Sequence, residues 1–293
     1  MPRVCFVVNP IAGKGRALAE WKKIEPVAAQ LGDYAVRFTE RPGHATELAR
    51  EAVRQGYDRV VSMGGDGTLN EVGNGLMGSG AALAVIPAGT GNDWARTSGV
   101  PRDSAEGCRL AFQGRLSRMD VGLAQGHRYF FNGAGFGLDA EVCARVNTYG
   151  PRFKKLSYVR GLLETLNQFT GVPLDVEVDG QRLHIPRALL LDVGIGRYLG
   201  GGMQFFPSAD PTDGLFEIIW GENLGRLELL QLVAKIYSGR HLGHPKVRTM
   251  RGRKLAANSS ARVVFQIDGE VVGHLPVTFE IIPKALDVVL PTA

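Results

Sequence analysis

Short apolar runs alternate with helix-like segments over residues 3–89, and this alternation constrains the fold more than any other feature of the chain. The strand-like runs are residues 3–10, 34–40, 58–65 and 82–89, and the helix-like segments are residues 16–31, 43–56 and 68–77. Apolar strands separated by helices are typical of a parallel sheet covered by helices on both faces. We therefore expect a doubly wound α/β domain, in which a ligand binds at the carboxyl ends of the strands.

The chain changes character after about residue 115, where strand-like segments are mostly joined by turns. These segments are residues 115–124, 127–137, 173–185, 187–196, 216–223, 261–272 and 276–283. Asp179-Gly180 is a strong signal for a two-residue hairpin, and helix-like segments 154–169 and 227–237 interrupt the region. We expect an α/β domain at residues 1–122 and a β-rich domain, a sandwich or a bent sheet, at residues 123–284. Residues 285–293 are candidates for returning to the first domain.

The composition is that of a globular protein able to bind an anion. The 293 residues are 44% hydrophobic with a formal charge of +5, which favours a nucleotide, an acidic membrane surface or nucleic acid without selecting among them. Residues 72–92 lack charge, but their glycines and a proline exclude a membrane span. The cysteines show no metal or disulfide spacing, and the N-terminus leads directly into a strand-like run. We therefore expect a cytoplasmic chain without a signal peptide, with its cysteines in the core.

Three glycine-rich loops follow strand-like runs: NPIAGKG at residues 9–15, GGDGT at residues 64–68 and PAGTGND at residues 87–93. Glycines let backbone N–H groups approach a ligand, and a following helix N-terminus favours negative charge. The segment around Lys14 is not a P-loop, because no Ser or Thr follows the lysine, and the spacing of the dinucleotide fingerprint is absent. The sequence therefore predicts another design for binding phosphate groups, at the carboxyl edge of the sheet.

Asp66 is the carboxylate inside GGDGT. We expect it to act in phosphoryl transfer through a nucleotide-bound Mg²⁺. The alternative is an N-cap for the helix over residues 68–77, and one side chain could serve both roles.

Two further acidic turns lie in the second half. Asp210 and Asp213 fall in an oxygen-rich turn that suits Mg²⁺, although an Asx-turn opening a strand is the more common outcome. Asp268 and Glu270 flank a glycine that by itself indicates a hairpin. Either carboxylate could accept a proton from a substrate hydroxyl.

Seven segments occur in order along the chain: NPIAGKG, GHATELA, GGDGTLNEV, PAGTGNDWAR, FNGAGFGLDAEV, GGGMQFFPSADPTDGLFEI and IDGE. Together they resemble the bacterial diacylglycerol kinase-like lipid kinases, whose catalytic domain is shared with eukaryotic diacylglycerol, sphingosine and ceramide kinases. The resemblance covers essentially the whole chain. It implies a nucleotide domain similar to NAD kinases and 6-phosphofructokinases, followed by a β-sandwich domain.

The resemblance also implies roles for individual residues. Glu270 would be the catalytic base, with Asp268 as the adjacent alternative, and Asp213 would bind a structural Mg²⁺ with the backbone carbonyls of Asp210 and Leu215. Asp120 would join the metal-linked network. ATP would be held by Asn9, Pro10, Ile11, Ala12, Gly13, Thr39, Gly64, Gly65, Asp66, Gly67, Thr68, Leu69, Asn70, Thr90 and Asn92. Ala12 departs from the family, whose members usually carry Ser or Thr there, so one hydroxyl contact to phosphate is missing.

We therefore expect an ATP- and Mg²⁺-dependent lipid kinase acting on a diacylglycerol-like lipid at a membrane surface, with peripheral membrane contact and no nucleic acid partner. Basic clusters at residues 152–155 and 246–254 would suit an anionic bilayer, although such clusters are usually solvated faces. The alternatives are a soluble-substrate kinase of the NAD kinase type and a non-catalytic nucleotide-sensing protein that docks on membranes. The acceptor lipid and the oligomeric state stay open, a homodimer included.

Overall fold

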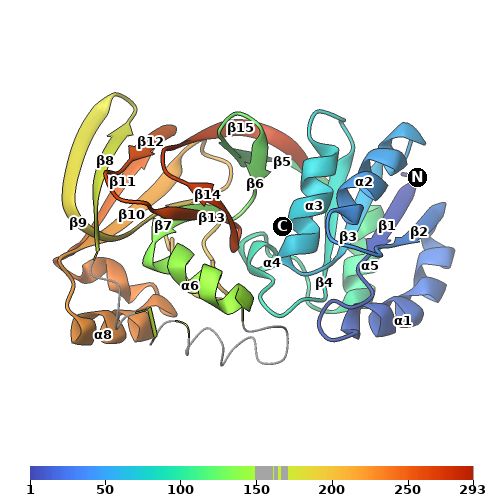
Figure 1. Ribbon diagram of the computed structural model, residues 1–293. Coiled ribbons are helices and arrows are strands. Elements are labelled where there is room, and N and C mark those ends of the chain that lie inside the picture. Colours follow the sequence, from blue (N-terminus) through green and yellow to red (C-terminus); the bar gives the residue numbers. More distant parts are fainter. Residues whose placement is uncertain (149–160, 162–163, 166–170, 293) are drawn as a thin grey trace. The chain divides into compact units, whose positions relative to one another are not determined.

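The computed structural model describes residues 1–148, 161, 164–165 and 171–292, and its contacts divide the chain into two compact units (Figure 1). The first unit contains Met1–Val121, Pro211–Asp213 and Ile282–Ala293. The second contains Gly122–Asp210 and Gly214–Ile281. Each unit has its own hydrophobic core.

The first unit has a parallel sheet in the order β2-β1-β3-β4. Its strands are β1 (Val4–Val8), β2 (Tyr34–Phe38), β3 (Arg59–Gly64) and β4 (Ala82–Pro87). The last part of β15 (Val277–Leu290) joins this sheet, with Val288 paired in parallel to Leu83 of β4. β1, β3 and β4 are almost entirely buried, as expected for strands covered on both faces.

Helices cover both faces of this sheet (Figure 1). Helices α1 (Arg16–Leu31) and α5 (Ser104–Gln113) share one core with the strands, which includes Phe6, Trp21 and Phe112. Helices α2 (His44–Arg54) and α3 (Asp66–Leu76) pack against each other on the other face, and α4 (Asp93–Thr97) is a short helix after β4. The predicted doubly wound α/β fold is confirmed.

The second unit is built from antiparallel strands in the order β14-β13-β7-β9-β8-β12-β15, and β10 pairs with β9 and β11. Its strands are β6 (Arg128–Phe130), β7 (Gly133–Gly137), β8 (Val172–Val178), β9 (Gln181–Gly194), β10 (Phe216–Glu222), β11 (Val247–Gly252), β12 (Lys254–Asn258), β13 (Val264–Ile267) and β14 (Glu270–His274). β5 (Arg115–Ala124) and β15 are each divided between the two units. Helix α6 (Leu138–Thr148) packs on β7, β13 and β14, and α8 (Arg226–Ile236) is followed by a 3₁₀ helix, η2 (Arg240–Gly243).

Aromatic side chains fill the core of the second unit. Phe130 stacks on Phe216 with ring centroids 5.8 Å apart, and Phe279 contacts Phe130, Phe136 and Phe265 edge-on or stacked. Each such pair adds about 0.5–1.5 kcal/mol beyond the burial of its area. The predicted β-sandwich-like architecture is confirmed.

Two hairpins of the second unit turn on Asp-Gly pairs. Asp179-Gly180 joins β8 to β9, and Asp268-Gly269 joins β13 to β14. All four residues have positive φ, between 47° and 87°, which is the signature of a type I′ turn. The hairpin predicted at Asp179-Gly180 is confirmed.

Several elements differ from the sequence-based expectation. The separate strands expected at residues 173–185 and 187–196 are instead β8 and one long β9, which continues through Pro186. Helix α3 begins two residues earlier than expected, and α4, α5, α6, β11 and β12 were not anticipated. The expected helix at residues 154–169 lies almost entirely outside the described residues. Cys5, Cys108 and Cys143 are buried, as predicted.

Candidate active site

Three loops leave the carboxyl edge of the parallel sheet in the first unit. They follow β1, β3 and β4, which are neighbours in the sheet, so the loops are neighbours too. These are the three glycine-rich loops that the sequence singles out. Parallel topology thus brings together the loops that begin at Asn9 and Pro87, which are 78 residues apart along the chain (87 − 9).

The loops pack backbone against backbone where glycines permit it. A Cβ at Gly89 would collide with the Cα of Gly65, and a Cβ at Gly13 would collide with the carbonyl oxygen of Ala88. Gly13 also has a φ of 60°, which L-residues with side chains rarely adopt. Any larger residue at position 13 or 89 would therefore push two loops apart.

Side-chain hydrogen bonds fix the loops further. Asn9 Nδ2 donates to Thr68 Oγ1 at 3.0 Å, which joins the loop after β1 to the start of α3. Asn92 Oδ1 accepts from the Gly89 N–H at 3.0 Å, and its Nδ2 donates to the Gly89 carbonyl at 3.1 Å. These three predicted nucleotide-site residues therefore shape the loops with their side chains.

Asp66 connects two of the loops. Its Oδ1 accepts from the backbone N–H of Asp93 at 2.8 Å and of Trp94 at 3.2 Å, at the start of α4. The alternative prediction, a cap for the helix that follows GGDGT, is wrong, because α3 begins at Asp66 itself and has no side-chain cap. Burial raises the pKa of Asp66, and the N–H groups of α4 act in the opposite direction.

The other predicted nucleotide-site residues divide by exposure. Leu69 is buried and its N–H donates to the Gly65 carbonyl, so this residue stabilises the loop without being accessible to a ligand. Asn70 accepts hydrogen bonds from Asn74 within α3. Pro10, Ala12, Thr39 and Gly64 are buried or half-buried, whereas Ile11, Gly67 and Thr90 are exposed.

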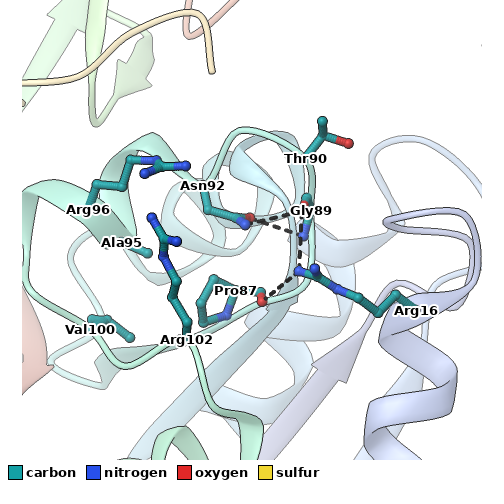
Figure 2. Close-up of a pocket in the computed structure, with 9 residues that line it drawn as sticks. All are labelled: Arg16, Pro87, Gly89, Thr90, Asn92, Ala95, Arg96, Val100 and Arg102. Atoms are coloured by element: carbon teal, nitrogen blue, oxygen red, sulfur yellow. Dashed lines mark hydrogen bonds between the residues drawn. The ribbon is translucent and has the colours of Figure 1, made fainter. Parts of the chain in front are cut away.

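A pocket of about 200 Å³ opens beside these loops (Figure 2). Arginines line it from three elements: Arg16 at the start of α1, Arg96 in α4 and Arg102 before α5. The remaining lining residues are Pro87, Gly89, Thr90, Asn92, Ala95 and Val100, and none of the nine is acidic. The pocket is therefore strongly positive and suits a multiply charged anion.

Backbone carbonyls hold two of these guanidinium groups. Arg16 Nη2 donates to the carbonyls of Pro87 at 3.2 Å and Gly89 at 3.3 Å, and Arg96 Nε donates to the Gly91 carbonyl at 3.2 Å. The loop after β4 thus fixes the arginines, as Figure 2 shows for Arg16. The sequence analysis missed all three, because no fixed spacing marks residues that only the fold brings together.

In the second unit, the side chain of Asp268 holds the loop at residues 131–133 through hydrogen bonds. Its Oδ1 accepts from the N–H groups of Asn132 at 2.9 Å and Gly133 at 3.0 Å, and its Oδ2 accepts from Phe131 at 3.0 Å. Its own N–H donates to the Gly133 carbonyl. A proton taken up by this carboxylate would break one of these hydrogen bonds.

Glu270 begins β14 directly after the same turn. Its side chain is 68% exposed, and its Oε2 lies 2.6 Å from Nη2 of Arg128. The two carboxylates of the IDGE segment therefore differ. Asp268 is bound by backbone amides, whereas the carboxylate of Glu270 is accessible and pairs with the guanidinium group of Arg128.

Comparisons with known proteins agree over both units. A family model described as the diacylglycerol kinase catalytic domain matches residues 3–124, and one described as the YegS C-terminal NAD kinase beta sandwich-like domain matches residues 133–290. A diacylglycerol kinase of Staphylococcus aureus (strain bovine RF122 / ET3-1) is 31% identical over 99% of this chain and 92% of its own. The chain belongs to the diacylglycerol kinase family.

Solved structures of other proteins share the fold of this family member. A crystal structure of a diacylglycerol kinase from Bacillus anthracis str. Sterne is 25% identical, with a TM-score of 0.76 over 99% of this chain and 97% of that chain. An NAD kinase from Archaeoglobus fulgidus, solved with ATP, shares the fold at 14% identity, with a TM-score of 0.53 over 98% of this chain and 93% of that chain. This family member is a kinase that phosphorylates an alcohol group, and its family makes it a lipid kinase.

The predicted magnesium residues lie in the turn before β10. The side chains of Asp210 and Asp213 are both exposed. In the first unit, the N–H of buried Asp120 donates to the Pro211 carbonyl at 2.8 Å, and Asp120 Oδ1 accepts from the Lys284 N–H at 2.8 Å. Among the described residues, no group of three or more His, Cys, Asp or Glu side chains is gathered to hold a metal. Two accessible carboxylates suit Mg²⁺ with water as its other ligands, but they form no closed protein site.

The basic cluster at residues 246–254 of this family member is largely paired with acids. Lys246 lies 2.7 Å from Glu228, Arg251 lies 2.8 Å from Glu217, and weaker pairs join Arg248 to Glu222 and Lys254 to Glu280. The segment is mostly β11, which pairs with β10. Its positive charge is therefore mostly compensated. The cluster at residues 152–155 lies outside the described residues, and none of the helices within the described part of the chain is long and apolar enough to cross a membrane.

Proposed function

We propose that this kinase transfers the terminal phosphate of ATP to a hydroxyl group of a membrane lipid, with a diacylglycerol-like lipid as the acceptor. The observation that carries the proposal is the joined set of three glycine-rich loops beside an acid-free pocket with three arginines. That combination is a binding site for phosphate groups in a chain of the diacylglycerol kinase family. The family relation supports a lipid acceptor and ATP as the donor.

The first unit would hold the nucleotide. N–H groups of the loops and the guanidinium groups of Arg16, Arg96 and Arg102 would bind phosphate oxygens, and their positive charge would stabilise the negative charge on the transferring group. Phosphoryl transfer depends mainly on positioning and electrostatics, so a rigid cationic pocket supplies much of what the reaction needs. Bound Mg²⁺, with Asp210, Asp213 and the carbonyl of Leu215 as proposed ligands, would supply further positive charge.

Glu270 is the proposed base. It accepts the proton of the acceptor hydroxyl while that oxygen forms a bond to the terminal phosphorus and the bond from phosphorus to ADP breaks. The exposure of Glu270 supports this role, and the three backbone hydrogen bonds to Asp268 argue against the neighbouring carboxylate. Arg128 would orient the Glu270 carboxylate before the substrate arrives.

Apolar side chains on α8 support peripheral contact with a membrane. Leu227 is 77% exposed and Leu230 is 43% exposed, and Tyr237 just beyond the helix is 60% exposed. The inner face of α8 is packed through Leu229, Leu232 and Ile236. Exposed leucines on a packed helix can insert at the level of the lipid headgroups.

The test is phosphate transfer from labelled ATP. The purified protein is incubated with Mg²⁺ and with vesicles of phosphatidylglycerol and phosphatidylcholine that contain diacylglycerol. We expect a labelled lipid phosphate whose formation requires the diacylglycerol and is abolished in Glu270→Gln.

Parallel incubations separate the alternatives. Labelling of NAD in place of lipid would replace the proposal with an NAD kinase-type activity. Binding of ATP without transfer to any lipid of a broad panel would indicate a nucleotide-sensing protein.

A further inference from the structure

A buried polar row crosses the sheet of the second unit beside the turn that precedes Glu270. Gln266 on β13 is in register with Gly135 on β7, and Gly135 is in register with Asp192 on β9. Gln266 is 1% exposed and Asp192 is completely buried. Such groups are costly to bury unless they satisfy one another, so the row needs an explanation.

Gly135 makes room for the carboxyl group of Asp192. A Cβ at position 135 would collide with Asp192 Oδ1 and would lie 2.5 Å from its Cγ. Asp139, the second residue of α6, lies against the same part of the sheet, because α6 packs on β7 and β13. The missing side chain at position 135 therefore lets two carboxyl groups meet beneath a helix.

The two carboxyl groups satisfy each other only if they share a proton. Both oxygens of Asp192 and Oδ1 of Asp139 are shielded from water, and within the described part of the chain they have no partner other than the neighbouring carboxyl group. Burial, followed by the charge of Asp139, holds the pKa of Asp192 well above its usual range. Burial also raises the pKa of Asp139, whereas hydrogen bonds from Asp192, the Ala140 N–H and Gln266 counteract this effect. An O–H on Asp192 that donates to Asp139 would satisfy both buried carboxyl groups.

This arrangement dictates how Gln266 is oriented. Asp139 can only accept, so Gln266 must turn its amide nitrogen toward it, and Nε2 donates to Asp139 Oδ2 at 3.0 Å. The amide oxygen then faces the opposite way and accepts from the Gly269 N–H at 2.8 Å. Gly269 is the second residue of the turn between β13 and β14, and Glu270 follows it directly.

We propose that Gln266, oriented by the Asp139–Asp192 pair, is a positioning residue that fixes the turn from which Glu270 acts. The turn is held at both of its residues: the side chain of Asp268 holds the first against residues 131–133, and Gln266 holds the second through its N–H. The inference rests on the proposed function, because it assigns to the turn the task of placing the base. A displaced base costs rate without weakening nucleotide binding.

Three variants test the chain of contacts. Gln266→Leu removes both amide hydrogen bonds, Asp139→Ala removes the group that orients Gln266, and Asp139→Asn keeps an oxygen that accepts from Gln266. We expect the first two to lower kcat for lipid phosphorylation by about 10²-fold with the KM for ATP unchanged. Asp139→Asn should restore near-wild-type kcat. The double variant Asp139→Ala/Gln266→Leu should be no slower than either single variant, because both act through one contact.

A second measurement does not depend on activity. Amide hydrogen exchange of Gly269 should accelerate by about tenfold or more in Gln266→Leu and Asp139→Ala. It should stay slow in the matched control Gln181→Leu, whose exposed glutamine flanks the equivalent turn at Asp179-Gly180.

Two results would overturn the proposal. One is faster exchange at Gly269 with unchanged kcat. The other is a loss of kcat that Asp139→Asn fails to restore although Gly269 stays protected. A wild-type protein that binds ATP but phosphorylates no lipid would instead overturn the proposed function, and this outcome is recognised before any variant is made.

Discussion

Asp66, which we expect to act in phosphoryl transfer, also holds two loops of the site together. Its Oδ1 caps α4, so the position of the loop after β3 is tied to that of the loop after β4. From the sequence, GGDGT identifies the loop but not the helix that its aspartate caps. That partner lies 27 residues further along the chain and is set by the fold.

The cap and the charge of Asp66 can be separated by two variants. Asp66→Asn keeps an oxygen that accepts from α4, whereas Asp66→Ala removes it and should lower the free energy of unfolding by about 1 kcal/mol relative to Asp66→Asn. Both variants should lower kcat by at least about 10²-fold if the carboxylate charge acts in transfer. Chemical denaturation and the lipid kinase assay measure the two effects. Near-native turnover of Asp66→Asn would limit the residue to capping.

Asp268 and Glu270 are expected to respond in opposite ways. Asp268→Asn places an NH₂ group against a backbone N–H and should lower the free energy of unfolding by about 1–3 kcal/mol. Glu270→Gln changes an exposed side chain, so its melting temperature should be unchanged while kcat falls by about 10²-fold or more. Thermal unfolding recorded beside initial rates distinguishes the two. If Asp268→Asn were stable but inactive and Glu270→Gln were active, Asp268 rather than Glu270 would be the base.

The raised pKa of Asp192 makes the stability of the protein depend on pH. The folded chain retains a proton that the unfolded chain releases above about pH 4, so the free energy of unfolding falls as pH rises from there toward the folded-state pKa. Asp192→Asn cannot lose a proton and should gain stability relative to wild type as the pH rises above about 4. Melting temperatures of both proteins across this range provide the check. Parallel curves would show that Asp192 is already ionised in the folded protein.

At the scale of elements, the sequence predicts those helices and strands whose signals lie in neighbouring residues. Helix α1 has the predicted bounds, because a glycine loop precedes its amphipathic pattern and Gly32 follows it. Helix α5 was missed although Asp103 caps it through the N–H groups of Ala105 and Glu106, a signal present in the sequence. β9 could not be predicted as one strand, because Pro186 indicates a break that neighbouring strands override.

The arginine pocket exemplifies what local patterns do not record, since its three charges come from α1, α4 and the segment before α5. Arg102→Ala should raise the KM for ATP by about tenfold, because a hydrogen bond to a charged group contributes about 1.5–3 kcal/mol. Arg109→Ala, an exposed change on α5 outside the pocket, is the matched control and should leave the KM unchanged. Titration of initial rates with ATP gives both values. Equal KM values for the two variants would place the nucleotide elsewhere.

At the scale of the molecule, each unit is assembled from segments far apart in the chain. The first unit takes Pro211–Asp213 from between the two segments of the second unit and Ile282–Ala293 from after them. The sequence predicted an α/β and a β-rich half from the change in strand spacing. The sequence singled out Asp213 as a candidate metal ligand but did not indicate that Pro211–Asp213 belongs to the first unit, where the Pro211 carbonyl accepts from the N–H of buried Asp120.

Nucleotide binding should therefore leave a local trace in the first unit. ATP with Mg²⁺ should slow amide exchange in residues 9–15, 64–70 and 88–92, and should raise the melting temperature as expected for a ligand that binds only the folded state. The aromatic core of the second unit should show no comparable local protection. Exchange measured by mass spectrometry, with and without the nucleotide, tests this. Protection absent from these three loops would contradict the nucleotide assignment.

The collision expected at Gly135 has a consequence for how this chain can evolve. Gly135→Ala should be more harmful alone than after Asp192 has been replaced by alanine or glycine, although a Cβ at position 135 would still lie 2.9 Å from the Leu191 carbonyl oxygen. The order in which the two substitutions arise therefore matters. In descendants of this sequence, substitutions at positions 135 and 192 should accordingly occur together. In a library randomised at both positions, few folded variants should carry a large side chain at both.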